Sequence, residues 1–245
     1  FDAVLFDLDG VLTATARLHA ACWKKMFDDY LAGRAAAAGQ PLEPFEIATD
    51  YRRYVDGKLR YDGVQSFLRS RDIDLPWGDP HDPPDRETVC GLGNRKNELI
   101  GELLDTDGVD VYESSITWLR QLRQAGFATA VVSASKNCAR VLEAAGIAEL
   151  FDTRVDGVVA AAIGLAGKPA PDTFLEGARR LGVVPARAVV VEDAVSGVQA
   201  GKAGGFGLVI GVDRAGNPGA LRDGGADLVV EDLGELMEEG RNDPA

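Results

Sequence analysis

The sequence predicts an α/β protein with a parallel sheet core and a helical segment inserted after the first strand. Apolar runs of five to seven residues alternate with short helical patterns, which is typical of strands buried on both faces of a parallel sheet. The runs lie at 2–6, 127–133, 188–193 and 207–212, and helical patterns between them lie at 137–145 and 171–181. Residues 13–106 contain helical patterns at 19–31, 63–70 and 88–104 and no convincing strand. We therefore expect this stretch to form a separate helical unit.

The composition is that of an ordinary globular protein and limits the possible partners. The 245 residues are 46% hydrophobic and 27% charged, with a formal net charge of −13 and a pI near 4.6. This acidity argues against binding to nucleic acid or to an anionic membrane surface. No apolar run approaches the roughly 20 residues that cross a bilayer. Cys22, Cys90 and Cys138 are widely spaced, which predicts packing residues in a reducing cytoplasm.

The stretch FDLDG, beginning at Phe6, places two aspartates at the end of the first apolar run. Asp7 and Asp9 are two residues apart, so both can point to the same side of the chain. Two carboxylates aimed at one point repel each other unless a proton or a cation lies between them. An acidic turn at Gly10 is the alternative interpretation of this motif taken alone.

Polar residues follow the other predicted strands at their carboxyl ends, where ligands bind in open parallel sheets. Ser133 ends the run at 127–133, and Glu192 and Asp193 end the run at 188–193. Lys168 lies between them in GKPAPDTF. Taken singly, the serine and the acidic pair could cap helices, and the lysine could be an exposed loop residue. Their convergence at one sheet edge favours a functional site instead.

A cluster of carboxylates without histidine or cysteine ligands suits Mg2+, and a phosphoryl group suits such a cation. Asp7 could attack phosphorus to form an aspartyl-phosphate, and Asp9 could protonate the leaving oxygen. Ser133 could donate to a phosphoryl oxygen, while Lys168 offsets the carboxylate charge. Positioning and charge neutralisation provide most of the catalysis in phosphoryl transfer. These residues therefore predict a Mg2+-dependent phosphotransferase.

This motif series resembles that of the haloacid dehalogenase superfamily over essentially the whole chain. The matching stretches are DLDG, the serine after the second predicted strand, GKPAPDTF, and VVEDAVSGVQAGKAGG. The resemblance implies a Rossmann-like parallel sheet core (the haloacid dehalogenase fold) with a helical cap domain. It also implies that Asp7 is the nucleophile and Asp9 the acid/base. Mg2+ would be held by Asp7, the Asp9 carbonyl and Asp193, with Glu192 in or beside that shell.

Further stretches resemble the β-phosphoglucomutase family within this superfamily. They are SASKN at 133–137, His19 and Trp23 in LHAACWKKM, DGKLR at 56–60, and RKN at 95–97. The resemblance implies that Arg60, Ser135, Lys136 and Asn137 hold a distal phosphate and that His19 and Lys96 line the cap side. Gly57 and Ala134 would complete the substrate site. Without the resemblance, His19 is more often a surface or core histidine and Arg60 a solvated charge. Lys96 could pair with Glu98 or Glu102.

The resemblance therefore implies conversion of β-glucose 1-phosphate to glucose 6-phosphate through a bisphosphate. A sugar-phosphate phosphatase of the same superfamily is the alternative, and a binding module that has lost the chemistry is a third reading, opposed by the intact Asp7, Asp9, Lys168 and Asp193. We expect a cytoplasmic monomer that binds a small phosphorylated sugar. Residues 1–14 and 107–245 would form the core and 15–106 the cap. Ala14 departs from the family, where an aspartate is usual, and this removes one loop carboxylate.

Overall fold

The computed structural model describes residues 1–39 and 41–237 and is built on a six-stranded parallel sheet. The strand order is β3-β2-β1-β4-β5-β6, so β1 lies at the centre between β2 and β4. The strands are β1 (Ala3–Phe6), β2 (Ala128–Val132), β3 (Thr153–Val155), β4 (Ala188–Glu192), β5 (Leu208–Val212) and β6 (Leu228–Val230). This order brings the carboxyl ends of β1, β2 and β4 next to one another.

Alternate residues of each strand enter two different apolar clusters because strand side chains point to opposite faces. In β1, Val4 and Phe6 join one cluster, whereas Ala3 and Leu5 join the other. The first face is covered by α4 (Glu113–Gln124) and α5 (Cys138–Ala144), and the second by α7 (Asp172–Leu181) and α8 (Val195–Ala203). The remaining core helices are α6 (Gly157–Ile163), α9 (Pro218–Gly224), and the 3-10 turns η2 (Ala148–Leu150), η3 (Pro185–Arg187) and η4 (Leu233–Leu236). Burial on both faces explains why the central strands are continuous apolar runs.

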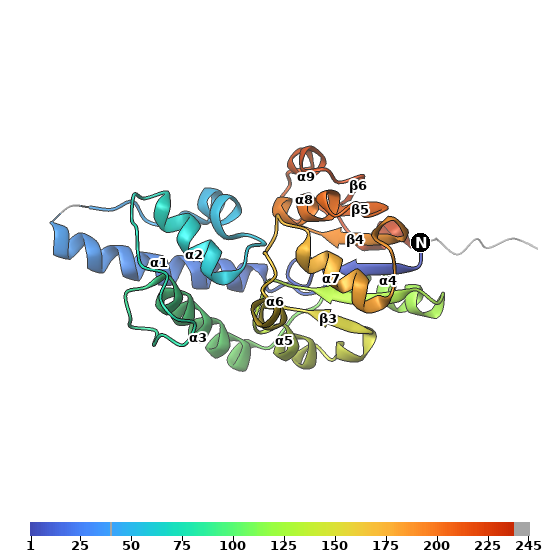
Figure 1. The fold of residues 1–245 in the computed structure, drawn as a ribbon, viewed down its shortest axis with the longest axis horizontal. Helices are drawn as coiled ribbons and strands as arrows, with labels where there is room; N and C mark the ends of the chain where they lie inside the picture. Colours follow the sequence, from blue (N-terminus) through green and yellow to red (C-terminus); the bar gives the residue numbers. More distant parts are fainter. Residues whose placement is uncertain (40, 238–245) are drawn as a thin grey trace, which may run out of the picture.

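The segment after β1 forms a helical unit that lies beyond the carboxyl ends of the strands (Figure 1). It consists of α1 (Ala16–Ala38), the π-helix η1 (Ile47–Val55), α2 (Arg60–Arg69) and α3 (Val89–Asp107). An apolar cluster of its own holds this unit together, and Phe27, Phe45 and Phe67 are at its centre with no exposed surface. The two segments that connect the sheet to the helical unit run side by side. Ala14 N donates to Asp110 O and Tyr112 N donates to Leu12 O, both at 2.9 Å.

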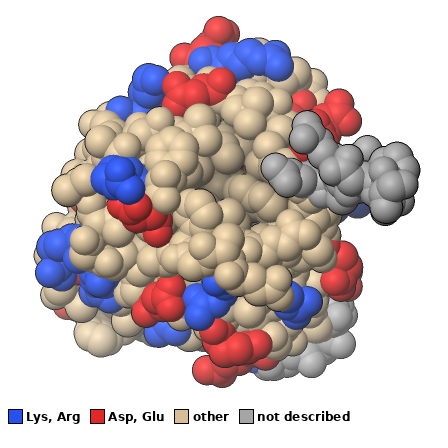
Figure 2. Space-filling model, turned by 90° about the vertical axis from the view of Figure 1, so that its right-hand side faces the viewer, with Lys and Arg blue, Asp and Glu red and all other residues tan. Residues whose placement is uncertain are grey.

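The predicted α/β architecture with a helical insertion is confirmed, and the four predicted strands are present. The strands β3 and β6 and the helices η1 and α4 were not predicted from the sequence. Cys22, Cys90 and Cys138 are all buried free thiols. Within the described residues, no helix is both long and apolar enough to span a bilayer. On the face shown in Figure 2, acidic and basic side chains are interspersed around a largely uncharged centre.

Candidate active site

The carboxyl ends of three neighbouring strands bring the predicted core residues together. Asp7 directly follows β1, Ser133 directly follows β2, and Glu192 is the last residue of β4. The Asp7 backbone is fixed in this position because its N–H donates to Val191 O at 2.9 Å. Register therefore places the Asp7 carboxylate between a hydroxyl and a second carboxylate.

Lys168 lies beneath this group and is almost fully buried. Its Nζ donates to Asp7 Oδ1 and Glu192 Oε1, both at 2.5 Å, and to Val132 O at 3.2 Å. An ammonium group has three protons, so these contacts use all of them. Although burial alone lowers the pKa of Lys168, the Asp7 and Glu192 carboxylates raise it above its usual value. Lys168 is thus a fixed positive charge that orients Asp7.

Asp7, Glu192 and Asp193 form an oxygen-only cluster suited to a divalent cation. One ligand atom from each residue lies within 4.8 Å of the others. The cluster fits a hard cation such as Mg2+ because its donors are all carboxylate oxygens. Gly10 leaves room for it, since a Cβ at this residue would lie 1.9 Å from Asp193 Oδ2. Gly10 also has a φ of 87°, a left-handed conformation that favours glycine.

Burial raises the pKa of every carboxyl group in this cluster. It raises the pKa of Asp7 to about 6 and that of Glu192 to about 7, in both cases against the opposing charge of Lys168. Burial also raises the pKa of Asp193, and the neighbouring carboxylates Asp56 and Glu192 raise it further. A cation in the cluster would favour the charged forms and lower these pKa values.

The Asp9 carboxylate is turned toward the helical unit. Its Oδ1 accepts a hydrogen bond from Thr15 Oγ1 and lies 3.5 Å from His19 Nε2. His19 Nδ1 lies 2.7 Å from Lys96 Nζ. Burial lowers the pKa of His19 well below its usual value, and the Lys96 charge lowers it further. A buried chain therefore runs from α3 through α1 to Asp9.

Three cationic side chains line the same cavity as the carboxylates. Arg60 begins α2, its guanidinium lies 5.2 Å from the Tyr61 ring centre, and its buried Nε has no hydrogen-bond partner. Lys136 Nζ lies 3.3 Å from Tyr61 Oη and 4.7 Å from the ring centre. Lys96 lies 5.2 Å from the Trp23 ring centre. These side chains offer positive charge and one unused hydrogen-bond donor, Arg60 Nε, to an anion.

The SASKN loop, residues 133–137, also lines the cavity. Ser133 Oγ accepts from Ser135 N at 3.1 Å, which leaves its hydroxyl proton available. Ser135 Oγ in turn accepts from Asn137 N at 3.1 Å. Asn137 Nδ2 donates to Asn97 Oδ1 of α3 at 2.9 Å, so the loop also contacts the helical unit.

The helical unit closes over these residues. Ser196 Oγ of α8 donates to Asp56 O at 2.9 Å, and Gly57 lies so close that a Cβ there would be 2.2 Å from the same Oγ. The enclosed cavity has a volume of about 70 Å3, far below the roughly 300–1,000 Å3 of small-molecule pockets. Every predicted site residue except Lys168 lines it: Asp7, Asp9, His19, Gly57, Arg60, Lys96, Ser133, Ala134, Ser135, Lys136, Asn137, Glu192 and Asp193.

Several lining residues were not assigned a role from the sequence, and three of them come from η1 and the turn after it. Tyr51 of η1 and Asp56 at its end approach the carboxylate cluster from the helical unit, and Lys58 follows them. Burial, together with the neighbouring Glu192 carboxylate, raises the pKa of Asp56 to about 7. The DG pair at 56–57 indicates a turn, but nothing in the spacing indicates that the turn faces the strand ends.

Comparison with known proteins places this site in a family. Residues 1–205 match the haloacid dehalogenase-like hydrolase family. The chain belongs to this family. It is 52% identical over 238 residues to the β-phosphoglucomutase of Mycobacterium tuberculosis, a match that covers 96% of this chain and 91% of the relative.

Solved structures extend the likeness to the fold. The β-phosphoglucomutase of Clostridium difficile superposes with a TM-score of 0.75 at 26% identity, covering 98% of this chain and 94% of that one. CbbY of Rhodobacter sphaeroides, crystallised with xylulose-(1,5)bisphosphate, superposes with a TM-score of 0.71 at 25% identity, covering 96% of both chains. The predicted relationship to the β-phosphoglucomutase family is therefore confirmed.

Proposed function

We propose that the protein is a Mg2+-dependent β-phosphoglucomutase that works through an aspartyl-phosphate at Asp7. One observation carries the proposal: the cavity is lined by two sets of groups that can hold a phosphate. The first is Asp7 with the carboxylate cluster, and the second is the cationic set of Arg60, Lys96 and Lys136. A phosphatase needs only the first, whereas a mutase must hold a bisphosphate in two orientations.

In this mechanism Asp7 attacks the phosphorus of the bisphosphate, and the bond from phosphorus to the sugar oxygen breaks. Asp9 gives its proton to that leaving oxygen and later removes the proton from the hydroxyl that attacks phospho-Asp7. Ser133 donates to a phosphoryl oxygen, and Lys168 holds Asp7 in line. Bound Mg2+, held by Asp7, Asp193, Glu192 and the Asp9 carbonyl, would neutralise charge on the phosphoryl oxygens.

The helical unit supports the mutase reading because it encloses the cavity. We assign residues 15–106 to a cap domain and residues 1–14 and 107–245 to the core. The 70 Å3 cavity requires the cap to open for a sugar phosphate to bind and to close for transfer. In the closed state an oriented hydroxyl can have an effective molarity of roughly 10^5–10^8 M, enough to outcompete water.

The test is to incubate the protein with Mg2+, β-glucose 1-phosphate and a trace of the bisphosphate, then to quantify glucose 6-phosphate and free phosphate. We expect glucose 6-phosphate to be the main product and Asp7→Asn to give neither product. Free phosphate as the main product would favour the sugar-phosphate phosphatase. Turnover by Asp7→Asn would show that Asp7 is not the nucleophile.

A further inference from the structure

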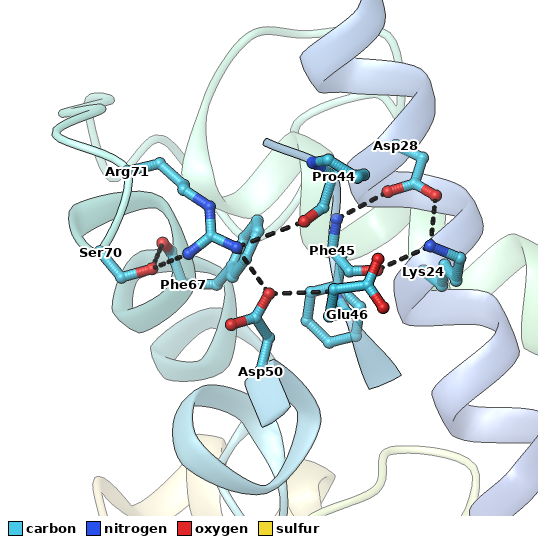
Figure 3. A network of polar contacts seen from close by, with 9 residues as sticks. All are labelled: Lys24, Asp28, Pro44, Phe45, Glu46, Asp50, Phe67, Ser70 and Arg71. Carbon is cyan, nitrogen blue, oxygen red and sulfur yellow. Dashed lines mark hydrogen bonds and ion pairs between the residues drawn. The ribbon is translucent and has the colours of Figure 1, made fainter. Parts of the chain in front are cut away.

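A polar network in the cap holds the segment that leads into the catalytic cavity (Figure 3). On one side, Arg71 Nη2 donates to Asp50 Oδ2 at 2.6 Å and to Pro44 O at 3.3 Å. Its Nη1 donates to Ser70 Oγ at 3.1 Å, and the guanidinium lies 4.6 Å from the Phe67 ring centre. Arg71 thereby ties the end of α2 to Pro44, which precedes η1, and to Asp50, which lies within η1.

The other side of the network comes from α1. Asp28 Oδ1 accepts from Phe45 N at 2.8 Å, and Lys24 Nζ donates to Phe45 O at 2.7 Å. Lys24 and Asp28 are themselves paired at 3.0 Å. Because the Phe45 ring is fully buried against Phe27 and Phe67, both the backbone and the side chain of this residue are fixed.

Asp50 lies within η1 and connects this network to the helix. Its Oδ2 accepts from Glu46 N at 2.9 Å, which secures the residue just before the helix. The next residue is Tyr51, which lines the cavity, and its carbonyl accepts from Asp56 N at 2.9 Å. Asp56 and Gly57 then contact Ser196 of the core. A short covalent and hydrogen-bonded path therefore connects Arg71 to the cavity wall.

A stability role alone does not account for the Arg71–Asp50 pair. Both side chains are largely buried, with 18% and 10% exposed, and Arg71 Nε has no hydrogen-bond partner. Burying an ion pair costs desolvation that its attraction often fails to recover, and apolar replacements are often as stable. Such a pair does fix the relative orientation of the two segments that it joins, because a planar guanidinium allows few hydrogen-bonding geometries. The helix it directs is a π-helix, a rare form that is frequent at functional sites.

We propose that Asp50 and Arg71 are positioning residues that set η1, and through it Tyr51 and Asp56, against the sugar during phosphoryl transfer. This inference rests on the proposed function, which it deepens. Neither residue touches the cavity, so each acts through η1. Loosening the pair should misplace the sugar without disturbing the chemistry at Asp7.

The test compares Asp50→Asn, Arg71→Met and Arg71→Lys with the unaltered protein. A misplacement of about 1 Å costs roughly 100-fold, so we expect Asp50→Asn and Arg71→Met to lower kcat for isomerisation roughly 10- to 100-fold. Hydrolysis of acetyl phosphate, which has no sugar to position, should stay within about twofold. Arg71→Lys keeps the charge and one donor toward Asp50, and it should recover part of the loss.

Asp82→Asn is a matched control in the same cap. Asp82 is also buried and hydrogen-bonded, accepting from Thr88 Oγ1 at 2.7 Å and from Asp79 N at 3.0 Å, but its network does not reach η1. We expect this variant to keep its isomerisation rate. Amide hydrogen exchange should rise over residues 47–57 in Arg71→Met and remain unchanged there in Asp82→Asn.

Several outcomes would overturn the proposal: equal losses in isomerisation and acetyl phosphate hydrolysis, no loss in either, or the same loss in Asp82→Asn. If the unaltered protein hydrolyses sugar phosphates without isomerising them, the mutase assignment fails. The positioning role of Asp50 and Arg71 is then tested by the rate at which their variants hydrolyse sugar phosphates. In that case a selective loss of sugar-phosphate over acetyl phosphate hydrolysis supports the positioning role, and a parallel loss contradicts it.

Discussion

The contact between Lys96 and His19 determines which nitrogen of the His19 ring carries the proton. The Lys96 ammonium can only donate, so His19 Nδ1 must accept from it, and the ring proton lies on Nε2. That proton faces Asp9 Oδ1 at 3.5 Å. Asp9 therefore accepts a hydrogen bond from Thr15 and has the protonated nitrogen of His19 nearby.

Replacement of Asp9 by asparagine should expose its role as acid/base. We expect Asp9→Asn to lose roughly 10^2–10^4-fold in kcat, the usual contribution of a positioned acid/base. Metal binding should remain, because the backbone carbonyl is unchanged. Rate assays with sugar phosphates and calorimetric titration with Mg2+ measure the two effects. An unchanged rate with a leaving group that needs protonation would contradict the assignment.

Lys96 should make phosphate binding sensitive to alkaline pH. Burial lowers the pKa of Lys96 to about 8, so the side chain is a cation below that pH and loses its charge above it. Since kcat/KM reports the pKa values of the free enzyme, we expect it to fall as the pH rises through about 8. A bound phosphate favours the cation, so kcat should fall only at higher pH.

The control for this profile is Lys96→Met. It should have a low kcat/KM at every pH and should lack the inflection near pH 8. If the inflection persists in Lys96→Met, another group is responsible for it.

At the scale of elements, one glycine allows the cap loop to rest on α8. Gly57 has a φ of 68°, and a Cβ there would approach Ser196 Oγ to 2.2 Å and Ala194 Cβ to 3.3 Å. The left-handed conformation alone costs a non-glycine residue roughly 1–2 kcal/mol. We expect Gly57→Ala to hold the cap away from the core and to reduce isomerisation at least tenfold in a steady-state assay.

A second substitution separates the clash from the backbone strain. Ser196→Ala removes the nearest atom but leaves the φ of Gly57 unfavourable for alanine. The pair Gly57→Ala with Ser196→Ala should therefore recover activity in part over Gly57→Ala alone. No recovery, or full activity in Gly57→Ala itself, would show that this contact does not limit closure.

The elements that the sequence predicts well are those with long patterns. The strands β1, β2, β4 and β5 are apolar runs because both of their faces are covered. The strands β3 and β6 have only three residues each, too few for an alternation to emerge. The helix α4 does have a helical pattern of apolar residues, since Ile116, Leu119 and Leu122 recur every three residues. This helix could therefore have been predicted.

The candidate site divides in the same way. Asp7, Ser133 and Glu192 could be predicted because strand ends meet at one edge of a parallel sheet. Arg60, Lys96 and Lys136 came only from the family resemblance. Tyr51 and Asp56 could not be predicted because they depend on a π-helix, whose period differs from 3.6, and on how the cap rests on the core.

For the whole molecule, the buried carboxylates link stability to pH and metal. Asp7, Glu192 and Asp56 have pKa values of about 6, 7 and 7 in the folded protein, against 3.8 to 4.5 for ordinary carboxyls. The metal-free folded state thus binds more protons than the unfolded state between about pH 4 and 7. These groups stabilise the metal-free folded state at low pH, and this stabilisation is lost as the pH rises through this window.

A divalent cation should counter this loss. We expect saturating Mg2+ to raise the melting temperature by several degrees at pH 7.5 and by clearly less at pH 5, where protons compete for the same oxygens. Thermal denaturation with Mg2+ or with EDTA at both pH values measures the difference. Asp193→Asn should abolish most of the effect, and an equal rise at both pH values would contradict the linkage.

The proposed mutase reaction requires that the cavity hold one phosphate at Asp7 and a second at Arg60. The most direct measurement is the ratio of isomerisation to hydrolysis in Arg60→Ala. Hydrogen bonds to a charged group contribute about 1.5–3 kcal/mol each, so losing a bidentate grip should lower isomerisation tens- to thousands-fold. Hydrolysis of acetyl phosphate should hardly change, so the ratio should collapse. If both activities fell equally, or if neither fell, Arg60 would not hold the second phosphate and the mutase account would be contradicted.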